Sequence, residues 1–135
     1  MRRLFSATFT NGTVHFSLLL LRLVFGGLML THGWPMLMNF ASLSHKFADP
    51  LHVGHTVSLG MVVFAEVFCS VFIILGLLTR LAAIPLVVCM SVALFMIHAH
   101  DTIDVKEKAI AFLAVFVVLL FCGPGKVSFD SLIGR

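Results

Sequence analysis

The chain has 135 residues, of which 60% are apolar types and 11% are charged. An ordinary soluble domain is about 45–50% apolar and about 25% charged. With so little charge, the chain cannot cover a water-facing surface of its own size. This composition excludes intrinsic disorder, argues against a soluble domain, and predicts an integral membrane protein whose main partner is the lipid bilayer.

Nine Lys and Arg residues against six Asp and Glu residues give a formal net charge of +3. The basic residues are scattered singly and form no basic stripe, so we expect no nucleic-acid partner. Loops next to a membrane explain them better. The three cysteines, Cys69, Cys89 and Cys122, each lie in an apolar run and form no CxxC pair. Their spacing does not match a zinc site, so we predict small buried side chains and no metal centre.

Four apolar runs follow one another along the chain. They cover residues 16–38, 57–78, 81–98 and 105–122. A transmembrane helix needs about 20 residues, and the fourth run approaches that length only if Lys106 and Lys108 extend outward at its start. Short connections make successive helices antiparallel. We therefore predict an all-α fold: one domain over residues 1–135 that forms an integral membrane four-helix bundle.

The connections between these runs are recognisable. A polar loop covers residues 39–56, and a charged loop covers residues 99–108. Thr79-Arg80 forms a tight joint, with Pro85 expected in about the first turn of the helix that follows, where proline is tolerated. Gly123-Pro124-Gly125 is expected to end the fourth helix.

The Lys and Arg residues of the loops predict the orientation in the membrane. The Lys and Arg residues expected on one side are Arg2, Arg3, Arg80, Lys126 and Arg135. Those expected on the other side are Lys46, Lys106 and Lys108, among several acidic residues. Because the first side is more basic, we predict that both termini are cytoplasmic.

Four ionisable residues inside or at the end of the apolar runs are the candidate site residues: Arg22, His32, Glu66 and His98. An ionisable group in a membrane costs at least about 2.5–3.5 kcal/mol on insertion scales, so it tends to face the protein interior. A rise of about 1.5 Å per residue places His32 about 9 Å and Glu66 about 13–14 Å from the outer ends of their helices. We expect these two and His98 to converge, with Arg22 about 15 Å deeper.

Several kinds of chemistry fit such a group, and the sequence leaves them open. A carboxyl group and imidazoles in an apolar pocket can relay protons, for example to a quinone, or can line a proton or solute path. They can equally form a structural polar clamp between helices. The segment His98-Ala99-His100-Asp101 could bind a transition metal weakly, but a solvated helix end is the preferred interpretation.

A family resemblance covers almost the whole chain. It rests on Leu21-Arg22-Leu23, on Thr31-His32-Gly33-Trp34, on Glu66, on the stretch from Leu75 to Ala83, and on the stretch from Gly123 to Asp130. Together, in this order, these segments resemble the DoxX family. The positions that match the family pattern are Arg22, His32, Gly33, Glu66, Gly76, Thr79, Arg80, Gly123, Gly125, Ser128 and Asp130. Trp34-Pro35-Met36 departs from it, since relatives more often carry glutamine or lysine soon after the His-Gly pair.

The resemblance implies a small four-helix protein of the bacterial inner membrane. The family name traces to relatives in a thiosulfate:quinone oxidoreductase, and other members are linked to thiol-redox and oxidative-stress functions. The resemblance therefore suggests a quinone as candidate ligand and a redox enzyme as partner, and a homo-oligomer stays open. The chain has no dinucleotide fingerprint, P-loop or CxxCH motif, so it is expected to hold no redox cofactor of its own. Whether it is an enzyme, an accessory subunit, a permeation module or an assembly protein stays open.

Overall fold

The computed structural model describes residues 2–134 and, over these residues, is helical with no strand. Arg135, which the charge pattern assigns to the cytoplasmic side, lies outside the described residues. The elements are η1 (Arg2–Phe5), α1 (Asn11–Met38), α2 (Phe40–Leu43), α3 (His55–Val63), η2 (Phe64–Cys69), α4 (Ser70–Leu75), α5 (Thr79–Val92), η3 (Ala93–Ile97), α6 (Ile103–Cys122) and α7 (Phe129–Ile133). The prediction of an all-α fold is confirmed.

Two of these elements are π-helical turns inside longer helices. The π-helix η2 joins α3 and α4 into one helix over residues 55–75, and the π-helix η3 extends α5 to residue 97. The long helices therefore follow the four predicted apolar runs closely. The first begins earlier than expected, at Asn11, because Thr10 caps it by accepting a hydrogen bond from the Thr13 N–H at 3.2 Å.

Three helices are long and apolar enough to cross a membrane, within the described part of the chain. They cover Asn11–Met38, His55–Leu75 and Thr79–Ile97. The fourth long helix, α6, carries Asp104, Lys106, Glu107 and Lys108 in its first turns. A fourth membrane span therefore rests on the sequence argument alone, as does the cytoplasmic placement of the termini.

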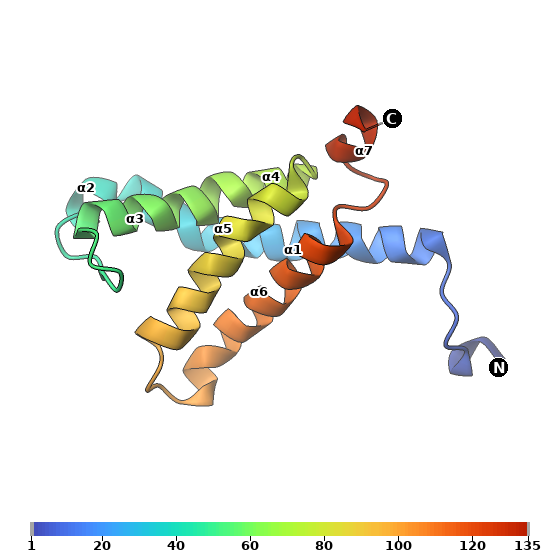
Figure 1. The fold of residues 1–135 in the computed structure, drawn as a ribbon, viewed down its shortest axis with the longest axis horizontal. Helices are drawn as coiled ribbons and strands as arrows, with labels where there is room; N and C mark the ends of the chain where they lie inside the picture. The colour runs from blue at the N-terminus through green and yellow to red at the C-terminus, as the bar shows by residue number, and fades with distance from the viewer. Residues whose placement is uncertain (1, 135) are drawn as a thin grey trace.

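The long helices form two antiparallel hairpins that cross each other (Figure 1). One hairpin pairs α1 with the helix formed by α3, η2 and α4, and the other pairs α5 with α6. The hairpins meet near the turn between α4 and α5, and they diverge toward the loops at residues 39–54 and 98–102 (Figure 1). The core between them is apolar, with Met29, Ile73, Leu86 and Phe116 almost fully buried.

The second long helix ends at Leu75 rather than at Leu78, which corrects the predicted boundary. Gly76 has a φ of +68° and Leu78 a φ of +49°, so the chain turns sharply between α4 and α5. Glycine adopts this left-handed conformation without strain, whereas a side chain makes it costly. Pro85 also differs from expectation: it lies inside α5, six residues after the helix begins at Thr79.

Candidate functional site

Glu66 is almost fully buried and has neighbours on α1 and α5. It lies on the π-helix η2, with 6% of its surface exposed. The backbone of α1 approaches it closely, because a Cβ built on Gly33 would lie only 2.7 Å from the Glu66 Cβ. Any larger residue at position 33 would therefore push α1 away from Glu66.

The carboxyl group of Glu66 is poorly satisfied. Its Oε1 has one weak partner, the Cys89 thiol on α5, whose Sγ lies 3.9 Å away. Its Oε2 is buried and has no hydrogen-bond partner among the described residues. Two other buried side-chain oxygens there lack partners, in Ser70 and Thr79, but both are neutral hydroxyls. An unpaired buried carboxyl oxygen is more costly, so Glu66 is the anomaly of this fold.

A cavity of about 330 Å³ opens beside this carboxyl group. Its walls come from α3 and η2 on one side and from α5 and η3 on the other, with contributions from Met36 of α1 and from the loop that precedes α3. The lining residues are Met36, Phe47, Ala48, Pro50, Leu51, Ser58, Met61, Val62, Phe64, Ala65, Glu66, Pro85, Val88, Cys89, Val92, Ala93 and Ile97. Nearly all are apolar, so Glu66 and Cys89 provide most of the polar chemistry. We refer to this space as the Glu66 cavity.

The loop wall of the cavity is held by Asp49. Its carboxylate accepts hydrogen bonds from the Ser58 hydroxyl at 2.7 Å, the Gly54 N–H at 2.8 Å and the Val53 N–H at 3.0 Å. The Ser58 hydroxyl, followed by these backbone donors, lowers the pKa of Asp49 from its ordinary value. The loop thus has a defined conformation, and its flanking residues Phe47 and Pro50 form part of the cavity wall.

The two candidate histidines have other neighbours. The exposed ring of His32 packs edge-on against Phe112 of α6, with ring centroids 5.9 Å apart. The Nδ1 of His98 lies 2.6 Å from the Oδ2 of Asp101, in an exposed pair at the loop after η3. Glu66 is joined by hydrogen bonding to neither histidine among the described residues. Hydrogen bonding among the described residues therefore links Glu66 with Cys89 and with neither imidazole, and the convergence of Glu66 with His32 and His98 stays a prediction.

Arg22 is the second buried ionisable side chain, and each of its three side-chain nitrogens donates at least one hydrogen bond. Its Nε donates to the Ile73 carbonyl at 2.9 Å and its Nη2 to the Ile74 carbonyl at 2.9 Å. Its Nη1 donates to the carbonyls of Pro124 at 2.9 Å and Val127 at 2.6 Å. Arg22 therefore caps the carboxyl end of α4 and ties the C-terminal segment to it, which suits the planar fork of donors of a guanidinium.

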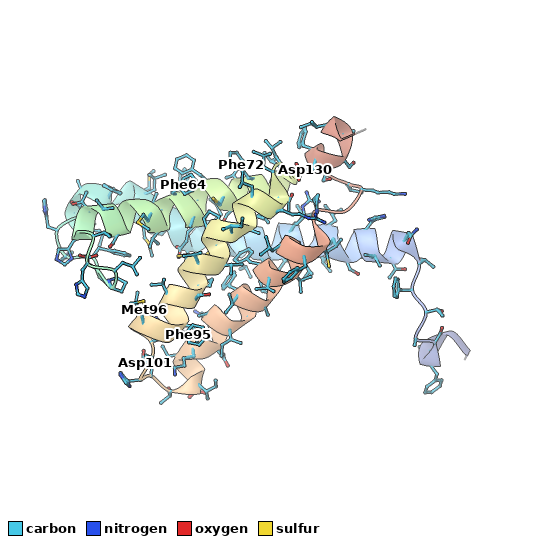
Figure 2. The ribbon with its side chains drawn as sticks, viewed as in Figure 1. Phe64, Phe72, Phe95, Met96, Asp101 and Asp130 are labelled. Atoms are coloured by element: carbon cyan, nitrogen blue, oxygen red, sulfur yellow. The ribbon has the colours of Figure 1, made fainter. Side chains whose placement is uncertain are left out.

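Asp130 completes this end of the molecule from the C-terminal segment. Its Oδ1 accepts from the Leu78 N–H at 2.6 Å and its Oδ2 from the Thr79 N–H at 2.9 Å, so it caps the start of α5. Figure 2 shows Asp130 beside the turn between α4 and α5. The Asp130 N–H also donates to the Gly76 carbonyl at 2.8 Å. We call Arg22, Gly76, Thr79, Ser128 and Asp130 the Arg22 cluster.

The other predicted motif residues of this region lie in the Arg22 cluster or next to it. A Cβ on Gly76 would collide with the Arg22 guanidinium and would lie 2.5 Å from the Ser128 Cβ. Ser128 caps the short helix α7 by accepting a hydrogen bond from the Ser131 N–H at 3.2 Å. Gly123 lies under the Arg80 side chain, whose Nη2 donates to the Phe121 carbonyl at 3.3 Å, and Gly125 faces His15. These residues hold the ends of helices together.

Sequence reasoning missed Cys89 as a neighbour of Glu66. Cys89 looks like an ordinary small apolar residue of the third span, and no motif marks it. It also missed the two π-helical turns, both of which line the Glu66 cavity. Such turns are frequent at functional sites, but their one-residue insertion leaves no clear trace in an apolar sequence.

Comparison with known proteins agrees with this arrangement of motifs. The sequence model of the DoxX family matches residues 17–99, which is more than half of the chain. The chain belongs to the DoxX family. The match contains Arg22, Glu66 and Gly76, whereas Ser128 and Asp130 lie beyond it.

A curated relative from Haemophilus influenzae is 29% identical to this DoxX-family chain over 101 residues. The alignment covers 71% of this chain and 67% of the relative, which is described only as an uncharacterized protein. No solved structure matches the chain. Family membership and the apolar helices together establish a DoxX-family membrane protein.

Proposed function

We propose that this protein binds a quinone-like molecule in the Glu66 cavity and acts as an accessory subunit of a redox system in the bacterial inner membrane. The observation that carries the proposal is the buried carboxyl group of Glu66: its Oε2 has no partner among the described residues, and the residue lines an apolar cavity. A buried polar group left unsatisfied costs about 1–3 kcal/mol, and more when it is charged. A ligand that supplies a hydrogen-bonding oxygen would relieve this cost.

The cavity fits such a ligand in size and chemistry. Its volume of about 330 Å³ lies at the lower end of the range of small-molecule sites, about 300–1,000 Å³. The apolar walls favour a ligand with an apolar ring, such as a quinone. A carboxyl group accepts a hydrogen bond from a hydroxyl when ionised and donates one to a carbonyl when protonated. Glu66 could therefore bind either the quinol or the quinone form and move a proton at the oxygen it contacts.

The electrons would have to come from a partner protein. The chain carries no sequence motif for a nucleotide or haem cofactor, and a bound quinone would supply the redox chemistry when present. The chain's own contribution would be to hold the ring, exclude water and handle a proton at Glu66. This division of labour supports an accessory subunit more than a self-sufficient enzyme, and it agrees with what the family resemblance implies.

For the membrane topology we propose four spans with both termini in the cytoplasm. Arg80 and Lys126 then lie at the cytoplasmic end, next to the Arg22 cluster. At the other end, the Lys106 Nζ donates to the Ala99 carbonyl at 2.9 Å, which suits a headgroup position for the start of α6. The Asp49 loop would then close the Glu66 cavity toward the periplasm.

The test is quinone binding by the full chain purified into lipid nanodiscs. We expect a ubiquinone analogue to bind the wild type and to bind Glu66→Leu about tenfold more weakly, because leucine makes no hydrogen bond and a lost hydrogen bond of about 1.4 kcal/mol changes affinity tenfold. Glu107→Leu is the matched control, because it makes the same chemical change at an exposed position of α6. Equal binding by wild type and Glu66→Leu, or binding by neither, would overturn the proposal.

A structural or assembly role is the second candidate. The Arg22 cluster favours this role, because a buried cation there holds the ends of helices together. This alternative predicts that Glu66→Leu changes protein stability or partner recovery without changing quinone binding. A proton or solute permeation module, in contrast, predicts a Glu66-dependent flux into liposomes.

A further inference from the structure

A second apolar groove lies next to the Glu66 cavity, along η2, α4 and α5. It has a volume of about 260 Å³. Its lining residues are Phe64, Cys69, Phe72, Leu78, Leu81, Ala82, Ile84 and Pro85. No charged side chain is among them. We call this space the α4–α5 groove.

The groove and the Glu66 cavity share two lining residues, Phe64 and Pro85. Phe64 lies half exposed on η2 and projects from the same side of its helix as Phe72 (Figure 2). Phe64 therefore lies at the boundary between the two spaces, and it belongs to the surface rather than to the buried core. Ala82, nearly fully buried at the base, leaves room that a larger residue would fill.

The two spaces lie one after the other along α5, and we call them together the track. Lining residues of α5 and η3 run from Leu81 to Ile97, which corresponds to about 24 Å at about 1.5 Å per residue. This approaches the hydrocarbon thickness of a bilayer, about 30 Å. Glu66 and Cys89 lie near the middle of this length. The part from Pro85 back to Leu81, toward the turn between α4 and α5, is wholly apolar. A ligand that fills the track has a polar head at Glu66 and a long hydrocarbon tail.

We propose that the α4–α5 groove holds the hydrocarbon tail of the molecule whose polar head binds Glu66. The ligand class is thus a long-chain lipid with a hydrogen-bonding ring or head, not a small water-soluble molecule. The inference rests on the proposed function and specifies its ligand. Its support is that the groove borders the cavity at Phe64 and Pro85, and that the polar side chains of Glu66 and Cys89 line the cavity whereas the groove is wholly apolar.

The test separates the head from the tail. Two benzoquinones with the same ring, one without a tail and one with two isoprene units, are titrated against the full chain in nanodiscs of fixed lipid content. The variant Ile84→Trp fills the groove from its rim, where Ile84 is 47% exposed. Ile110→Trp is the matched control, because Ile110 is 41% exposed on α6 and lines neither space.

We expect Ile84→Trp to weaken binding of the tailed quinone at least fivefold and to leave binding of the tailless quinone unchanged. Partition of the tailed molecule into lipid is the same for every variant, so it cancels in the comparison. Leu81→Trp, at another exposed position of the groove, should give the same result if Ile84→Trp folds poorly. Ile110→Trp should bind both quinones as the wild type does.

Two results would overturn the inference in distinguishable ways. If both groove variants bind the tailed quinone like the wild type while Glu66→Leu still weakens binding of both quinones, the groove holds bulk lipid and the head site stands. If neither quinone depends on Glu66, the proposed function fails and the tail site fails with it.

Discussion

Arg22 and Glu66 are both buried ionisable residues in apolar helices, yet their surroundings are opposite. Arg22 is 1% exposed and donates four hydrogen bonds to backbone carbonyls. Glu66 is 6% exposed and has one weak thiol partner, with Oε2 unpaired among the described residues. The donors of Arg22 are engaged in holding the fold together, whereas the carboxyl group of Glu66 is available to a ligand.

The difference separates stability from function. A buried charged group whose nitrogens all donate hydrogen bonds stabilises the structure around it, and its removal leaves several backbone carbonyls unpaired. A buried carboxyl group without partners weakens the structure and persists where a ligand completes it. The burial of an ionisable side chain alone does not distinguish these cases, but the number of its partners does. Substitutions at the two residues should therefore act on stability in opposite directions.

The largest expected effect is the loss of Arg22. In Arg22→Leu, four carbonyls lose their donor, so we expect the free energy of unfolding to fall by about 3 kcal/mol or more. Arg22→Lys should recover little of it, because one ammonium group cannot reproduce a guanidinium fork. Thermal unfolding in detergent measures both. Arg80→Leu is the control and should cost far less, since Arg80 is exposed and makes a single 3.3 Å hydrogen bond. An equal loss in both variants would contradict the role of the Arg22 cluster.

Gly76→Ala should have the next largest effect at the same end of the molecule. An alanine there is strained by the φ of +68° and collides with Arg22 and Ser128, so we expect a loss of about 2 kcal/mol. Gly60→Ala is the matched control, because nothing lies within 4 Å of a Cβ at that helical position. It should raise stability slightly. A neutral Gly76→Ala would show that this turn is not tightly held.

Glu66→Leu should act in the opposite direction. It removes an unpaired polar group from an apolar cavity, so we expect the ligand-free protein to gain about 1 kcal/mol. It should lose quinone binding at the same time. Thermal unfolding without ligand and a quinone titration, both on the full chain, test the two effects. Destabilisation comparable to that of Arg22→Leu would remove the contrast between the two residues.

The sequence predicts the helices well and the site only in part. Apolar runs determine where helices lie, because lipid leaves few alternatives for the backbone. The level of Glu66 along α1 is also predictable, since Gly33, the neighbour of His32 in the sequence, lies directly against it. Its neighbours are not: successive residues point about 100° apart around a helix, so Gly33 faces Glu66 while His32 faces Phe112. The partners of Arg22 are backbone carbonyls, which carry no side-chain signature at all.

The smallest expected effect is at the loop wall of the Glu66 cavity, far from the Arg22 cluster. Asp49 accepts hydrogen bonds in its ionised form, chiefly from Ser58, and its pKa is therefore lowered in the folded protein. A lowered folded-state pKa stabilises the fold above the unfolded value, about 3.9, and this contribution is lost as the pH falls through the folded-state pKa. Asp49→Asn should thus be less stable than the wild type at pH 7, with the difference shrinking in acid.

Stability measured across this pH range, together with quinone binding, tests the loop against the Arg22 cluster. Asp104→Asn is the control, because Asp104 is exposed on the first turn of α6 and lies away from the cavity. If the loop wall shapes the cavity, Asp49→Asn weakens quinone binding although it changes global stability little. Arg22→Lys should show the reverse: a large loss of stability, with binding retained in the molecules that stay folded. If Asp49→Asn leaves binding unchanged, the loop is only a connection, and the cavity is set by the helices alone.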